Sequence, residues 1–314
     1  MKRNKLALSC LLMVTGFFGA CTDMAEDDFQ NNKYPVELMA EKADMTFTRA
    51  IGEKTSWNGG EEISLYDGVT QKLYEVSASK EMTAKNNDPL YWYTTTEEET
   101  LFAWYPASET LLTGWTVPED QTTEEAYNQA DFLYAYEKMK FCSDRKLTFR
   151  HGTVKLIINV KGDDDTVSET DLEGAVFTVR TVTKATVSEG KISPAEGVET
   201  SVMHPFVSEV RKDYVASYQM LTVPQDMSGK LFFQVELKDG RKFAHTPGNG
   251  EGILESGHQY TYNVGVGKPG LVVEVEKNSA SWDGDDESVE GTDDAAESEV
   301  VDETDTFQTQ KENI

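Results

Sequence analysis

The sequence has little cysteine, little histidine and few basic residues for its length. Of 314 residues, three are cysteine and four are histidine, and 29 lysine and arginine residues stand against 56 aspartate and glutamate residues. The resulting formal charge of −27 argues against a nucleic-acid partner, because nucleic-acid phosphates would be repelled. The histidines are scattered, and none has a second ligand at the spacing of a zinc site: His151, His204, His245 and His258. No metal site is predicted.

The usual catalytic and nucleotide-binding motifs are also missing. The sequence contains no G-x-S-x-G elbow, no P-loop and no dinucleotide fingerprint. Carboxylates are abundant, but they cluster in the manner of solvated loops, as at Glu97–Glu99 and Asp163–Asp165. An enzyme with a site assembled from distant loops remains the alternative, because such sites on β-sandwiches leave no local motif. We predict a protein that is not an enzyme and has no cofactor.

Only one long apolar run is present, and it lies at the N-terminus. Three basic residues precede an apolar core from Leu6 to Phe18, which is too short to span a bilayer and is typical of a secretory signal. The core ends in Gly19-Ala20-Cys21, which resembles a bacterial lipobox. We therefore predict cleavage of the signal peptide 1–20 after Ala20, and attachment of lipid, including palmitate, to Cys21. The alternative is ordinary signal cleavage with Cys21 as a bystander.

The cysteine count has a structural consequence. Cys10 would leave with the signal and Cys21 would carry lipid, so only Cys142 would remain as a thiol. The sequence thus predicts no internal disulfide and a stability that depends on core burial. Cys142 is predicted to be a small strand residue and not a nucleophile, because no histidine lies near it in sequence.

The C-terminus is strongly acidic. Residues 283–314 contain thirteen acidic residues and one lysine. Such a segment cannot bury enough apolar surface to offset the entropy of ordering, so we predict a disordered tail. A calcium loop at Asp283–Glu287 is a weak alternative, because the turn glycine of an EF-hand is missing.

The middle of the chain is typical of an all-β protein. Short runs rich in aromatic and β-branched residues alternate with turn formers, as at Glu61–Gly68, Leu90–Thr95 and Thr153–Gly162. The clearest predicted hairpin is Lys238–Phe243, and only Thr122–Lys138 could hold a helical turn. We predict an acidic linker over 21–44 and two consecutive antiparallel β-sandwiches over 45–147 and 148–282.

Two aromatic clusters allow two interpretations. Trp92 and Trp104 stand next to tyrosines in "YWY" and "AWY". A sugar-stacking platform is one interpretation. The other, which we favour, is core packing, because large aromatics usually fill a sandwich that has no disulfide.

The stretch "MTFTRAIGEKTSW" (45–57) ends a strand-like pattern at an arginine. Met45 and Phe47 alternate with threonines and the pattern stops at Arg49, followed by Ala50. Arg49 is either an exposed arginine at the end of a permanent strand or a site where a protease removes that strand.

Several pieces, in order, resemble the fimbrillin-like family, the subunits of type V pili. They are Cys21 with an acidic stretch behind it, "FTRA" (47–50), "WNGGEEISLY" (57–66), "FAWYP" (102–106), "ADFLYAYEK" (130–138), "LTFRHGTVKLIINV" (147–160) and "ESGHQYTYNVGVGKPGLVVEVEKNSASW" (255–282). The acidic tail beyond Trp282 departs from the family pattern.

The resemblance implies transthyretin-like sandwiches and a surface-exposed outer-membrane lipoprotein precursor that is built into a fimbria. A protease would cut between Arg49 and Ala50, the strand containing Met45 and Phe47 would be displaced, and a neighbouring subunit would supply a substitute by β-strand addition. The candidate donor consists of Leu271, Val273 and Val275, which could equally form the last strand of their own domain. Partners would be other fimbrial subunits, in a homo- or heteropolymer, and the membrane through lipid on Cys21. The alternative function is a monomeric surface lipoprotein that binds glycan or a host or bacterial surface ligand.

Overall fold

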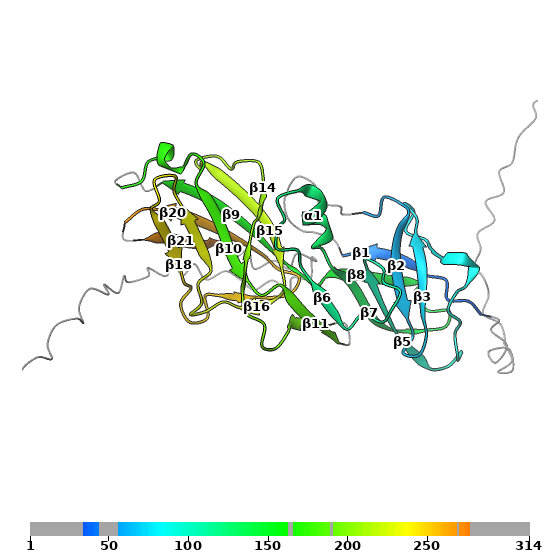
Figure 1. The fold of residues 1–314 in the computed structure, drawn as a ribbon. Helices are drawn as coiled ribbons and strands as arrows, with labels where there is room; N and C mark the ends of the chain where they lie inside the picture. The colour runs from blue at the N-terminus through cyan, green and yellow to red at the C-terminus, as the bar shows by residue number, and fades with distance from the viewer. Residues whose placement is uncertain (1–33, 44–55, 163–165, 189–190, 269, 277–314) are drawn as a thin grey trace, which may run out of the picture.

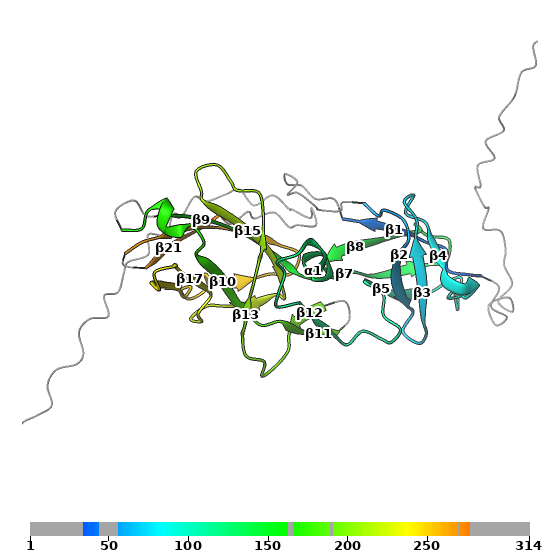
Figure 2. The same ribbon diagram turned by 45° about the horizontal axis from the view of Figure 1, so that its top comes forward.

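The chain folds almost entirely into β-strands, as Figure 1 shows in a computed structural model. The structure describes residues 34–43, 56–162, 166–188, 191–268 and 270–276. Their strands form two groups that lie side by side along an elongated molecule (Figures 1 and 2). The predicted all-β class is confirmed.

The first group is a seven-stranded sheet in the order β1-β8-β7-β5-β2-β3-β4. All neighbouring strands in it run antiparallel except β1 and β8, which run parallel. Its strands are β1 (Met39–Lys42), β2 (Glu61–Tyr66), β3 (Gln71–Val76), β4 (Met82–Ala84), β5 (Glu98–Tyr105), β7 (Leu133–Lys140) and β8 (Lys146–His151), with a short 3-10 helix η2 (Lys85–Asn87) after β4.

The core of this sheet comes from alternating strand positions. Ile63 and Leu65 of β2 and Leu101 and Ala103 of β5 are fully buried on its inner face, as the period of two of a strand requires. The intervening Phe102 and Trp104 on β5 are buried as well, but they join the core of the second group. The central strand therefore contributes to both hydrophobic cores.

The second group contains the remaining sheets. A five-stranded sheet has the order β14-β15-β9-β20-β21, a four-stranded sheet β13-β10-β17-β18, a three-stranded sheet β12-β11-β6, and β16 pairs with β19. The bounds are β6 (Gly114–Thr116), β9 (Val154–Gly162), β10 (Val176–Thr181), β11 (Lys184–Ser188), β12 (Lys191–Pro194), β13 (Ser201–Met203), β14 (Phe206–Val207), β15 (Ala216–Thr222), β16 (Gln225–Asp226), β17 (Phe233–Glu236), β18 (Lys242–His245), β19 (Ile253–Leu254), β20 (Gln259–Val266) and β21 (Leu271–Glu276), with a 3-10 helix η3 (Glu169–Leu172).

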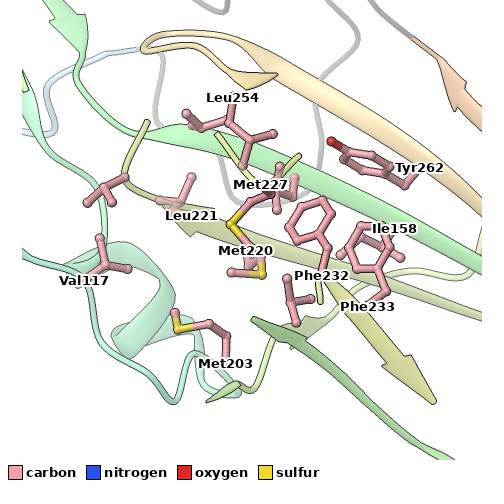
Figure 3. Close-up of a cluster of buried hydrophobic side chains, with 14 of the residues drawn as sticks. Val117, Ile158, Met203, Met220, Leu221, Met227, Phe232, Phe233, Leu254 and Tyr262 are labelled. Atoms are coloured by element: carbon pink, nitrogen blue, oxygen red, sulfur yellow. The ribbon is translucent and has the colours of Figure 1, made fainter. Parts of the chain in front are cut away.

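Aromatic and sulfur-containing side chains fill the core of the second group, as Figure 3 shows. Phe232 and Phe233 stack with ring centroids 4.1 Å apart, and Tyr262 meets Phe233 edge-on at 5.0 Å. Met220 and Met227 are fully buried against the same cluster. Flexible methionines fill the irregular space that the rings leave.

The chain crosses between the two groups more than once. After β5 of the first sheet, β6 pairs with β11 of the second group, and the chain then returns to the first sheet at β7. Between them lies the one α-helix of the described residues, α1 (Glu124–Gln129), whose N-terminus is capped by the Thr123 side chain. The prediction of a single helical turn within Thr122–Lys138 is confirmed. The final change of group falls between β8 and β9, after His151.

Local predictions had mixed outcomes. The Lys238–Phe243 hairpin is confirmed, since β17 and β18 pair across a turn in which Gly240 has a φ of +89°. The Leu90–Thr95 segment is not a strand, and its pairing is one bridge between Tyr91 and Pro35. The core interpretation of the aromatics is confirmed, because Trp92 and Trp104 are both buried.

Cys142 differs from the strand residue that the sequence predicts. It lies after the end of β7 with a φ of +60°, so it is a turn residue and not a strand residue. Its sulfur is disulfide-bonded. The prediction of no internal disulfide applies to the mature chain, in which Cys10 would be absent and Cys21 would carry lipid, and for that chain it stays a prediction.

Candidate functional site

The residues predicted around the lipid and the protease site cannot be placed. Ala20, Cys21, Met45, Phe47, Arg49 and Ala50 all lie outside the described residues. The candidate donor residues Leu271, Val273 and Val275 lie on β21. The nearest described residues on the N-terminal side of Arg49 are 34–43, which we call the closing segment.

The closing segment, which contains β1, lies between β8 and the residues around β4 at the opposite end of the sheet. On one side, β1 forms a parallel ladder with β8, from Met39 opposite Lys146 to Lys42 opposite Phe149 (Figure 2). On the other side, the Met82 N–H donates to the Leu38 carbonyl at 3.0 Å and the Ala40 N–H donates to the Lys80 carbonyl at 2.8 Å. The segment therefore joins β8 to the residues around β4.

The beginning of the segment is held in the same way. The Val36 N–H donates to the Leu90 carbonyl at 2.8 Å, and the Trp92 N–H donates to the Tyr34 carbonyl at 3.0 Å. Backbone pairing on two sides is typical of an interior strand and not of an edge.

Alternate side chains of the closing segment belong to the core of the first sheet. Val36, Leu38 and Ala40 are 2%, 5% and 0% exposed, whereas Glu37 is exposed. Trp57, which follows Arg49 in sequence, is also buried, and its indole Nε1 donates to the Ala40 carbonyl at 2.8 Å. The segment thus fills a trough whose walls come from the rest of the domain.

Charged groups line the outer side of the closing segment. Glu37 pairs with Arg145 at 3.3 Å, and Glu41 lies 3.5 Å from the Lys80 ammonium and 3.6 Å from that of Lys146. These pairs are open to solvent, so each contributes little to stability.

β21 is a strand of a different kind. It pairs antiparallel with β20 and is the last strand of its sheet, so no described strand is hydrogen-bonded to its other edge. Leu271, Val273 and Val275 are half-buried against the second core, and Val272 is 54% exposed. The donor role stays a prediction.

The described residues offer little for catalysis. No three histidine, cysteine, aspartate or glutamate side chains gather there in a metal-binding arrangement. Burial lowers the pKa of Lys155 on β9 to about 7, and burial raises the pKa of Glu99, but the two lie on strands of different sheets. His151 contacts Asp131 at 2.8 Å, at the junction of the two groups of strands. No helix among the described residues is long and apolar enough to cross a membrane.

Sequence reasoning missed the closing segment, which lies within the predicted linker. The signal was present in "PVELMAEK" (35–42), where Val36, Leu38 and Ala40 alternate with Glu37 and Glu41. The first strand was instead predicted at Met45 and Phe47, because these residues alternate with threonines immediately before Arg49.

Comparison with known proteins shows the family of the chain. The family described as "Fimbrillin-like" matches residues 48–282 of the chain. A Bacteroides uniformis protein named "Putative fimbrium subunit Fim1C" is 25% identical over 300 residues, which are 89% of this chain and 95% of that protein.

Two solved structures share the fold. A cell adhesion protein from Bacteroides uniformis, titled "putative", is 22% identical with a TM-score of 0.55, and covers 77% of this chain and 97% of its own. One from Bacteroides ovatus, with the same wording, is 19% identical with a TM-score of 0.57 and the same coverage.

Proposed function

Because the chain belongs to the fimbrillin-like family, we propose that it is a fimbrial subunit that assembles by exchanging its closing segment. A protease cuts between Arg49 and Ala50, the segment 34–43 leaves its trough together with Met45 and Phe47, and a strand of a neighbouring subunit replaces it. The observation that supports this most is the two-sided pairing of a core-forming segment that precedes Arg49 in sequence.

The energetics explain why the trough must be refilled. Exposing the side chains of Val36 and Leu38 costs about 3–6 kcal/mol. Backbone groups such as the Leu90 and Lys80 carbonyls and the Met82 N–H also lose their partners. This cost is a large share of a domain stability of about 5–15 kcal/mol, so the cut creates a strong drive to bind another strand.

The donor comes from another subunit. Within this chain the candidate is β21, with Leu271, Val273 and Val275 on one face, because an edge strand is paired on one side and gives up fewer contacts on leaving. The acidic tail is a poor donor, because its carboxylates would have to be desolvated in an apolar trough.

Lipid on Cys21 places the precursor on the outer membrane, where it is exposed at the cell surface before assembly. Two or three acyl chains hold a soluble domain there, since each buried methylene contributes about 0.8 kcal/mol. A cut after Arg49 separates the folded domain from Cys21.

Treatment of the purified precursor with an arginine-specific protease tests the proposal. Wild type is expected to form ladders that resist SDS until heated, and Arg49→Ala is expected to stay monomeric. Arg211→Ala, which removes an exposed arginine of the second group of strands, should behave as wild type. Clean cleavage at Arg49 that leaves only monomers would overturn strand exchange. It would favour a monomeric surface lipoprotein that binds glycan or a host ligand.

A further inference from the structure

Trp57 is part of the trough and not of the segment that fills it. It follows Arg49 in sequence, so a cut there leaves it with the folded domain. Its ring is 3% exposed and meets Phe149 edge-on at 5.3 Å and Tyr105 edge-on at 5.7 Å. Whichever strand occupies the trough therefore meets the same rigidly packed indole.

The indole completes the backbone pairing of one residue. In a strand the N–H and the carbonyl of a residue point to the same side. The Ala40 N–H donates to the Lys80 carbonyl at 2.8 Å, and the Ala40 carbonyl accepts from Trp57 Nε1 at 2.8 Å. A side chain thus supplies a donor that a neighbouring strand would otherwise provide, and it fixes which residue of the segment lies at this level.

The side chain at that position is small and fully buried. Ala40 is fully buried and lies opposite Leu147 in the parallel ladder, and Leu147 is fully buried too. The inward positions of the closing segment, Val36, Leu38 and Ala40, therefore read large, large and small. Adding methyl groups to a filled core position forces neighbours off their preferred rotamers.

We infer that Trp57 sets the register of any strand in the trough, through its hydrogen bond to one carbonyl, and that the buried position at that register then requires a small residue (alanine, serine or glycine) where Ala40 lies. The inference rests on the proposed strand exchange and adds a rule for the donor. Three successive inward-facing side chains of the donor must be large, large and small, and the carbonyl of the small residue must accept the hydrogen bond of the Trp57 indole.

β21 of a second copy breaks this rule. If Leu271 and Val273 fill the first two positions, Val275 falls at the third, and a shift by two residues places Lys277 there. Reversing the strand places Leu271 or Pro269 at that level, and proline has no N–H for the Lys80 carbonyl. The trough therefore favours a strand from a subunit with a different sequence, which narrows the choice of partner to a heteropolymer.

Competition between synthetic strands tests the inference. The full chain is cut with an arginine-specific protease in the presence of labelled peptide, so that the trough is not left empty, and cleavage at Arg49 is checked by mass. The peptides are residues 34–43, the same peptide with Ala40→Val or Ala40→Ser, and residues 270–279. We expect the Ser peptide to bind like the parent, and the Val peptide and 270–279 to bind at least about tenfold more weakly.

The Trp57→Phe variant is the control for the indole hydrogen bond in the same binding experiment. It keeps an aromatic ring but loses the indole donor, so it should bind the parent peptide more weakly and reduce the Ala-to-Val preference to about threefold or less. An unchanged preference would show that Trp57 does not set it. Equal binding of the Ala and Val peptides by wild type would overturn this inference alone. No binding of any peptide after verified cleavage would overturn both this inference and the proposed strand exchange.

Discussion

The closing segment and β21 both lie at the end of a sheet's strand order, but their backbones are paired differently. The closing segment is bonded to β8 on one side and to residues around β4 on the other, and its inward side chains are almost fully buried. β21 is bonded to β20 alone, and its inward side chains are half-buried. The closing segment completes the core of the first sheet, whereas β21 lies over the second core. Truncating buried side chains should therefore lower the free energy of unfolding more in the closing segment than in β21.

The largest expected difference is between core truncations in the first sheet and surface truncations in β21. Leu38→Ala should lower the free energy of unfolding by about 2–4 kcal/mol, because a nearly fully buried side chain leaves a cavity. Val272→Ala, at a 54% exposed position, should change it by less than about 0.5 kcal/mol. Urea unfolding of the uncut chain measures both, and equal losses would remove the contrast between the strands.

A change of pH should act on the sheet that contains β21 and not on the closing segment. Burial lowers the pKa of Lys155 to about 7, below the ordinary lysine value. Between that pH and about 10 the unfolded chain binds the proton and the folded chain does not, so stability should rise with pH, by up to about 1.4 kcal/mol per unit.

Lys155→Met should abolish this component, and Lys161→Met, on an exposed position of the same strand, should retain it. The measurement is the unfolding free energy at pH 7 and pH 9. Parallel pH dependence in wild type and Lys155→Met would show that burial of this ammonium group does not control the slope.

An intermediate effect is expected for the inward face of β21. Val273→Ala should lower the unfolding free energy by about 1 kcal/mol, less than Leu38→Ala, because Val273 is only half-buried. A loss as large as that of Leu38→Ala would mean that β21 is as integral to its core as the closing segment.

The smallest effect is expected from the charges on the closing segment. Glu41→Gln removes the contacts to Lys80 and Lys146, which are open to solvent, and should cost less than about 0.5 kcal/mol. The loss should shrink in 0.5 M salt, because exposed charges are screened. A larger, salt-independent loss would show that charge, and not side-chain burial, holds the segment in place.

The sequence predicted the strand-rich class and many local features for clear physical reasons. Period-two alternation predicted strands such as β2, and the Asp239-Gly240 turn predicted the β17–β18 hairpin. Aromatics in alternating strands predicted core, and Trp92 and Trp104 are buried.

Other features depend on partners that are remote in sequence. The role of 34–43 comes from β8 and from residues around β4, more than forty positions away in most cases, so no local pattern distinguishes it from a linker. Trp57 looked like one piece of a family motif, and its hydrogen bond to Ala40 emerges only when the two are brought together. The turn at Cys142 was missed because the strand ends two residues earlier than the apolar pattern suggests.

The parallel pairing of β1 with β8 has a mechanical consequence. The described chain begins at one end of the elongated molecule and ends at the other, and β1 runs along the long axis (Figures 1 and 2). A pull between a membrane-held N-terminus and a distant load would therefore act along the strand and stress all of its rungs together, instead of opening them one at a time. Such a joint resists shear, so the closing segment of the uncut chain should stay in place under load, and its release should require the proposed cleavage.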